Sequence, residues 1–134
     1  MSTITTMEQG RAAFAYICAT EGAELKEKSK EYRAYTRKLP MLIKTNGLGA
    51  AIAFAFAKGS ENRKVKPEKA WGLLYLHIQK WLGDKGLISI SGELAKTLTE
   101  LDSKTYRAIS VEVLALLAWI KRFAEALIDE EATD

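Results

Sequence analysis

The chain has 134 residues, of which 48% are hydrophobic and 28% are charged, and its net charge is +3. These proportions are those of one ordinary globular domain, and they exclude a chain that is disordered throughout. The longest strongly apolar stretch, Leu48–Ala57, has ten residues. A membrane-spanning helix needs ~20, so this stretch is too short to be one.

The N-terminus and the cysteine count indicate a cytoplasmic protein. The first seven residues lack the basic and apolar regions of a secretory signal. The single cysteine, Cys18, cannot form an internal disulfide and lies in an apolar helical context. We therefore expect Cys18 to be a small buried residue in a reducing compartment.

The charges are unevenly distributed along the chain. The tail, Asp129–Asp134, carries four acids and no base, so residues 1–128 carry 20 bases against 13 acids, a balance of +7. A net-positive body favours polyanionic partners without proving them. We expect residues 1–128 to form one helical domain and residues 129–134 to form a frayed, solvated acidic tail.

The first predicted helix begins at Thr6, because Thr6–Gln9 fits a capping box, and Gly22 is expected to break it. Residues 23–38 alternate in charge, which is typical of a solvated helix surface. Pro40 marks the start of the next helix, since proline is tolerated in a first turn and restricts the residue before it.

Residues 41–58 carry apolar side chains on every side of the helical wheel, which predicts a central helix packed on several faces. Gly47 and Gly49 each cost about 1 kcal/mol in a helix interior. Close approach of another backbone explains them better than a phosphate-binding loop, because no strand precedes them and no Gly-Lys-Ser or Gly-Lys-Thr follows. Gly59 is the expected C-terminal cap.

Residues 60–67 form a basic, polar connection to a predicted helix over residues 68–82. That helix has one buried stripe at helical spacing, made by Trp71, Leu74, Tyr75, Ile78 and Leu82. Residues 87–92 alternate briefly, but a single strand without a partner is not a sheet, so we expect a loop. Residues 93–100 predict a short helix.

The last predicted helix is capped by Asp102 or Ser103 and runs to about residue 128. Its buried stripe comprises Tyr106, Ile109, Val113, Leu116, Leu117, Ile120, Phe123 and Leu127. Its charged residues, Glu112 among them, are expected on the outer face. The sequence therefore predicts an all-α fold, a compact single-domain bundle of five or six helices.

No catalytic, cofactor or metal site emerges from the residue pattern. His77, the sole histidine, has no Cys, Asp or Glu at metal-ligand spacing, so we expect it at the surface or at a boundary. A Cys18–His77 pair would need an activating environment and a third, orienting group. Glu130 and Glu131 lie in the tail, where nothing desolvates them for acid–base work. We therefore expect no enzyme.

The basic residues near Pro40 and near the end of the last helix are the main functional candidates. Each is either a solvated charge or a contact to phosphate, the sequence-independent part of nucleic-acid affinity. Tyr32 and Tyr35 lie near them and could stack on bases, although packing in the core or against another subunit is the better account of both. The residues alone predict a helical binding or assembly module.

Three segments together resemble a known family. They are residues 38–54 (KLPMLIKTNGLGAAIAF), 102–107 (DSKTYR) and 112–125 (EVLALLAWIKRFAE). In this order and spacing they resemble the signatures of the small subunit of the Cmr complex, the type III-B CRISPR effector. The helix with Tyr75 and Trp81 is also similar, so the resemblance covers most of residues 11–126.

The resemblance implies an all-α protein without catalytic activity of its own. Several copies would stack as an inner filament in antiviral defence, alongside the backbone and large subunits that carry the activities of the complex. The implied partners are these Cmr subunits, copies of the chain itself, guide RNA and target RNA, with no membrane and no small-molecule substrate. By position, the resemblance carries the family's RNA-contacting role to the basic residues Arg37, Lys38, Lys44, Lys104, Arg107, Lys121 and Arg122. A subset of them is expected to line the RNA channel, and the alternative for the others is a contact to acidic patches on neighbouring subunits.

Two other classes of function stay open on the sequence. A DNA-binding regulator would use short helices with basic ends, but no segment is both exposed and rich in base-reading side chains. A protein-binding helical adaptor would need only the aromatic stripes and the acidic tail.

Overall fold

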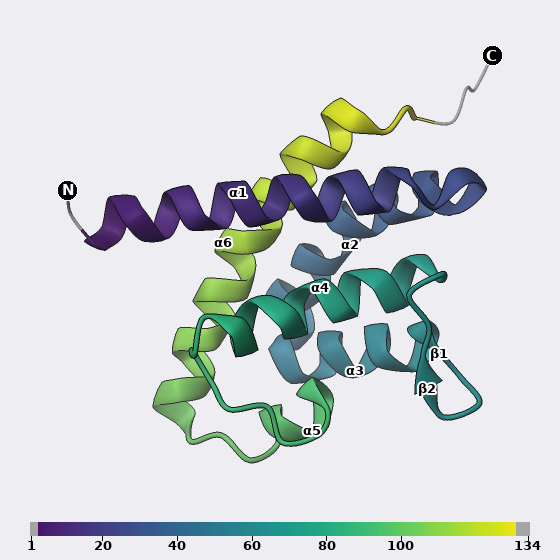
Figure 1. Cartoon of the computed structure of the whole chain (residues 1–134). Helices are drawn as coiled ribbons and strands as arrows, with labels where there is room; N and C mark the ends of the chain where they lie inside the picture. Colours follow the sequence, from purple (N-terminus) through teal and green to yellow (C-terminus); the bar gives the residue numbers. More distant parts are fainter. Residues whose placement is uncertain (1–2, 131–134) are drawn as a thin grey trace.

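The computed structural model describes residues 3–130, with side chains from Thr6 onward. The elements in chain order are α1 (Thr3–Ala23), the 3-10 turn η1 (Lys26–Lys28), α2 (Ser29–Asn46), α3 (Leu48–Gly59), β1 (Ser60–Glu61), β2 (Lys64–Val65), α4 (Ala70–Asp84), α5 (Leu94–Leu98) and α6 (Ser103–Leu127). The predicted helical bundle is confirmed, with one small hairpin added to it (Figure 1). No helix within the described range combines the length and the apolarity needed to cross a bilayer.

Helix α6 is the longest element and crosses α1 in Figure 1, packing along both α1 and α2. Its N-cap is Asp102, one of the two predicted candidates, since the carboxylate Oδ1 accepts a hydrogen bond from the Thr105 amide at 2.7 Å. Most of the predicted stripe is buried, whereas Leu127 stays 39% exposed. The core therefore lies along the inner face of this helix.

The expectation of an outer position is wrong for Glu112. Its carboxylate accepts two hydrogen bonds from the Arg11 guanidinium, at 2.7 and 2.9 Å, and one from the Trp81 indole at 2.8 Å. The side chains of Arg11 and Glu112 are 20% and 12% exposed. Arg11 comes from α1, Trp81 from α4 and Glu112 from α6. The hydrogen bonds to the half-buried Glu112 therefore join the three helices.

Two predicted helix starts are also wrong. Helix α1 begins at Thr3, so Thr6 lies inside it and not at its N-cap. Helix α2 continues through Pro40, and the break falls at Gly47 instead. Gly47 has φ +90°, a conformation that favours glycine, whereas proline removes one backbone donor from a helix that buries Leu39 and Ile43 on either side.

The explanation predicted for Gly49 is corrected as well. The Gly49 amide donates to the hydroxyl of Tyr106 at 2.7 Å, and an added Cβ would lie 3.3 Å from that oxygen. A side chain, not a backbone, therefore approaches this glycine. The close backbone approach occurs at Gly59 and Gly72, where an added Cβ on Gly59 would lie 2.5 Å from the Cα of Gly72.

The segment predicted as a polar connection folds into a hairpin. Strand β1 pairs antiparallel with β2, with Ser60 opposite Val65. The turn residues Asn62 and Arg63 both have positive φ, 53° and 67°, as a two-residue hairpin turn requires. The Lys66 amide donates to the Gly59 carbonyl at 2.8 Å, which closes the base of the hairpin against α3.

Helix α4 lies between the other helices, and its predicted stripe is buried. The predicted surface or boundary position of His77 is wrong, because His77 is only 4% exposed. Two polar partners make this burial possible: Tyr32 at Nδ1 and Glu21 at Nε2. Cys18 is fully buried, as predicted.

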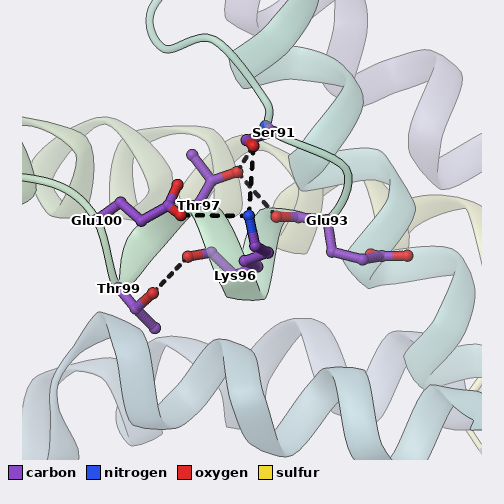
Figure 2. A network of polar contacts seen from close by, with 6 residues as sticks. All are labelled: Ser91, Glu93, Lys96, Thr97, Thr99 and Glu100. Atoms are coloured by element: carbon purple, nitrogen blue, oxygen red, sulfur yellow. Dashed lines mark hydrogen bonds and ion pairs between the residues drawn. The ribbon is translucent and has the colours of Figure 1, made fainter.

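Residues 87–92 form a loop, as predicted, and a local polar network holds this loop against the short helix α5 (Figure 2). The Thr97 hydroxyl accepts from the Ser91 amide at 2.8 Å and donates to the Glu93 carbonyl at 2.9 Å. Lys96 reaches Glu100 at 3.2 Å. A helix of five residues satisfies few of its own backbone groups, so these side chains stabilise it.

Candidate nucleic-acid interface

A shallow groove between α2 and α6 brings together three of the predicted cations. Lys44 comes from α2, and Lys121 and Arg122 come from α6. The groove has a volume of about 220 Å³, and its apolar walls are Pro40, Leu114 and Ala118. Because α2 packs against α6, the three charged groups line one groove although 77 residues separate Lys44 from Lys121 in the sequence.

The same face of α6 continues to its N-terminal end. Lys104 and Arg107 are exposed, and they lie on one helical stripe with Arg122 because α-helical side chains recur every 3.6 residues. Val111, 68% exposed, lies on this stripe between the two basic clusters. From Arg107 to Lys121 the stripe is roughly 21 Å long at 1.5 Å per residue.

We call Lys44, Lys104, Arg107, Lys121 and Arg122 together the α6 face. No member of this set has an ion-pair partner among the described residues. Arg122 lies over the Trp119 ring, with 5.5 Å between the guanidinium carbon and the ring centroid. These five charges are therefore available to an external anion.

Arg37 differs from the α6 face because acidic residues already surround it. Its Nη1 lies 3.6 Å from Glu130 and its Nε 4.0 Å from Glu125. Glu130 also lies 3.3 Å from the guanidinium of Arg33, a residue that the sequence reasoning did not single out. Within the predicted acidic tail, Asp129–Asp134, Glu130 is in contact with α2, and residues 131–134 lie outside the described residues.

Lys38 lies away from the α6 face. It projects over the Phe54 ring at 5.5 Å, in a depression bounded by α2, α3 and α4. Lys28, Lys58 and Lys69 line the same depression. Sequence reasoning missed these three, because they come from η1, α3 and the segment before α4, and no local pattern connects them.

The remaining reactive groups are buried among packed helices. Burial raises the pKa of the Cys18 thiol well above its usual 9.0, so the thiol form is favoured over the nucleophilic thiolate. Burial also lowers the pKa of His77 below its usual 6.5, against the opposing effect of Glu21. No group of three His, Cys, Asp or Glu residues in the described chain is placed to hold a metal ion.

Residues 7–127 match a family described as CRISPR-associated protein (Cas_Cmr5). The chain belongs to the Cmr5 family. A relative from Thermus thermophilus, the "CRISPR system Cmr subunit Cmr5", is 36% identical over 125 residues, which cover 93% of this chain and 98% of the relative. The resemblance stated from the three sequence segments is therefore confirmed at the level of the family.

A solved Cmr5 structure supports the same assignment. The crystal structure of a CRISPR-associated Cmr5 family protein, also from Thermus thermophilus, superimposes with a TM-score of 0.70 at 33% identity. The similarity covers 96% of this chain and all of the solved chain. The helical bundle described above is thus shared with a Cmr5 protein across its whole length.

The three Cmr5-like segments meet in space. The first segment contributes Gly49 and the second contributes Tyr106, which are joined by the 2.7 Å hydrogen bond between amide and hydroxyl. The first and third contribute Lys44 and Lys121 to opposite sides of one groove. The three segments, although separated along the Cmr5 chain, therefore form one continuous part of the fold.

Proposed function

We propose that this chain is the non-catalytic small subunit of a type III-B Cmr effector complex. Membership of the Cmr5 family makes it part of a multi-subunit Cmr complex. In this proposal several copies stack as an inner filament beside the backbone and large subunits. The filament supports the guide RNA–target RNA duplex in antiviral defence in the cytoplasm.

The observation that carries the RNA part of this proposal is the α6 face. Five cations that have no ion-pair partner within the described residues are spread over two helices, and three of them converge on one groove. Such an arrangement suits a row of phosphates, since phosphate contacts position a protein on a duplex without reading its sequence. Base pairing between guide and target supplies the sequence specificity in RNA-guided complexes.

The non-catalytic part rests on the surroundings of the nucleophilic and acid–base groups. Cys18 and His77 are 0% and 4% exposed, and neither lines any of the main surface depressions of the described chain. A catalytic group needs access to its substrate at hydrogen-bonding distance. The burial of both side chains therefore supports a role in assembly and RNA support.

Large apolar side chains on the surface support the stacking of copies. Tyr16 and Ile17 on α1 are 50% and 55% exposed, and Met41 on α2 is 67% exposed. Tyr16 also packs edge-on against Phe123 of α6, with ring centroids 5.3 Å apart. Exposed apolar and aromatic residues of this size are typical of protein contact surfaces.

The test replaces Lys44, Arg107 and Lys121 with glutamine in the assembled complex. Affinity for a guide–target RNA duplex is measured over a range of salt concentrations. The slope of log affinity against log salt is negative, and each lost phosphate contact makes it less negative by about 0.9. The expected change for the triple variant is therefore about 2 to 3.

The matched control replaces three exposed lysines that lie outside α2 and α6, namely Lys64, Lys80 and Lys96. It changes the net charge equally, so a general loss of electrostatic attraction would affect both variants alike. An unchanged salt slope in the first variant, or equal changes in both, would reject the α6 face as the RNA contact.

A further inference from the structure

The depression between α2, α3 and α4 is separate from the α6 face and has its own composition. Its volume is about 480 Å³, within the usual range of ligand pockets. It is lined by Lys28, Glu31, Tyr35, Lys38, Phe54, Lys58, Lys69, Ala70 and Trp71. We call it the lysine depression.

Four lysines and one glutamate surround this space. None of the four lysines has an ion-pair partner within the described residues. The lysines that form ion pairs there are Lys80 and Lys96. Gathering like charges around one hollow is unfavourable without a counter-charge. An anionic ligand would supply that counter-charge.

Aromatic rings form the floor of the lysine depression. Tyr35 and Trp71 are stacked, with ring centroids 4.1 Å apart and planes 9° apart, and Phe54 meets Trp71 edge-on at 5.3 Å. The ammonium groups of Lys38 and Lys58 lie 5.5 and 5.8 Å from the centroid of Phe54. These cation–π contacts hold two of the charges beside the rings.

The walls of the depression are fixed by the approach of α3 to α4. An added Cβ on Gly59 would lie 2.5 Å from the Gly72 Cα, and one on Gly72 would overlap the Lys66 carbonyl. The two helix ends are therefore closely packed. Lys58 and Lys69 flank this contact in the sequence, so the backbone positions from which both side chains extend are set by the packing of α3 on α4.

We propose that the lysine depression binds one nucleotide, with its phosphates among the lysines and its base against the half-buried rings of Tyr35 and Phe54. Lysine ammonium groups are strong phosphate ligands, and stacking on aromatic side chains is the sequence-tolerant way of holding a base. An acidic peptide would use the charges but would bring no base to stack on the rings. The ligand is either an unpaired nucleotide of an RNA strand or a free nucleoside polyphosphate.

Isothermal titration calorimetry on the full chain tests this inference. The probes are ATP, a 5′-phosphorylated tetranucleotide of adenosine, inorganic triphosphate and a hexaglutamate peptide. The variant Lys38→Gln/Lys58→Gln is expected to weaken both nucleotide probes at least tenfold. The control Lys80→Gln/Lys96→Gln removes the same charge and is expected to leave both unchanged.

A second variant separates a nucleotide site from a simple phosphate site. Tyr35→Leu is expected to weaken ATP and the tetranucleotide at least threefold while leaving inorganic triphosphate unchanged. The tighter of the two nucleotide probes identifies the source of the ligand. Equal effects of both lysine double variants, no effect of Tyr35→Leu on nucleotides, or tighter binding of hexaglutamate would overturn the proposal.

Nucleotide binding in the lysine depression is independent of the proposed RNA contact on the α6 face. The variant Lys44→Gln/Arg107→Gln/Lys121→Gln leaves the lysine depression intact and is expected to bind the nucleotide probes as tightly as the unaltered chain. Loss of nucleotide binding in that variant would show that the two surfaces are not separate sites.

Discussion

The Tyr32 hydroxyl lies 2.8 Å from Nδ1 of His77, in the buried contact between α2 and α4. Burial raises the pKa of Tyr32 well above its usual 10.0, so the hydroxyl keeps its proton and donates it. Nδ1 therefore accepts, and the Nε2–H donates to Glu21 at 2.6 Å. In the neutral imidazole both ring nitrogens therefore have a hydrogen-bond partner.

The stability of the chain is expected to depend on pH through His77. Burial lowers the pKa of His77 below 6.5 in the folded state, so between the folded-state pKa and pH 6.5 the unfolded chain binds a proton that the folded chain does not. The contribution of His77 to the unfolding free energy is therefore fully present above pH 6.5. It decreases by at most ~1.4 kcal/mol per pH unit as the pH falls from 6.5 to the folded-state pKa, and it is constant below that.

Urea unfolding at pH 7.5 and pH 5.5 measures this dependence. Since His77 is the sole histidine, His77→Gln should reduce the difference between the two conditions while leaving Tyr32 a polar partner. An equal pH dependence in both proteins would assign the effect to the carboxylates instead.

Removing the Glu112 carboxylate should destabilise the contact between α1, α4 and α6. Glu112→Ala leaves the Arg11 guanidinium and the Trp81 indole without their shared acceptor. We expect a loss of about 2 to 4 kcal/mol, because a half-buried charge loses its partner. Chemical unfolding measures this loss. The control Glu125→Ala, on the exposed side of α6, is expected to change the unfolding free energy by less than about 0.5 kcal/mol.

Gly72 should not tolerate a methyl group. An added Cβ would overlap the Lys66 carbonyl and crowd the Gly59 carbonyl, so α4 would have to move away from the base of the hairpin. Gly72→Ala is expected to lower the unfolding free energy by about 3 kcal/mol or more. The control Gly10→Ala, where Cβ meets Trp81 at an ordinary 3.7 Å, should raise it by up to about 1 kcal/mol.

The hydrogen bond from Gly49 to Tyr106 can be removed with little change of shape. Tyr106→Phe takes away the hydroxyl that accepts from the Gly49 amide, and the expected cost is about 1 kcal/mol. Tyr16→Phe is the matched control, since Tyr16 is half exposed. Thermal unfolding of the two variants compares them, and equal melting temperatures would mean that solvent replaces the hydroxyl.

Arg37 and Arg122 should contribute unequally to RNA binding. Arg37 lies near Glu125 and Glu130, whereas Arg122 has no ion-pair partner in the described chain. Releasing Arg37 from its carboxylates offsets part of any gain from a phosphate. In the assembled complex, Arg37→Gln should therefore change the salt slope by less than half as much as Arg122→Gln, and the reverse order would place Arg37 on the RNA.

The periodic features of the fold could be predicted from the sequence. The stripe with Trp71, Leu74 and Ile78, and the Asp102 cap, both follow from spacing within one helix, and the structure has them as predicted. The break between α2 and α3 could not be placed in this way. Pro40 and Gly47 are both helix-breaking residues, and tertiary burial of Leu39 and Ile43 keeps the helix intact at the proline.

In the candidate site, too, some features follow from residue spacing and others depend on tertiary packing. The four cations predicted on the last helix lie on α6, whereas Lys44, predicted in the helix that starts at Pro40, lies on α2 together with Arg37 and Lys38. The surroundings of these cations depend on segments far away along the chain. Arg37 lies near Glu130, and Lys38 lies with Lys58 over the Phe54 ring, away from the α6 face. None of these relationships has a local signal, because an ion pair or a ring contact between helices depends on how the helices pack.

Residue spacing alone establishes the helical class, the faces that α4 and α6 bury, and an excess of positive charge ahead of an acidic end. These properties are local, since helix periodicity and capping act over a few neighbouring residues. Long-range packing is what buries His77 beside Tyr32, places Glu112 between three helices, and selects the lysines that share a hollow. Polar side chains reach those positions because partners from other helices offset the cost of removing them from water.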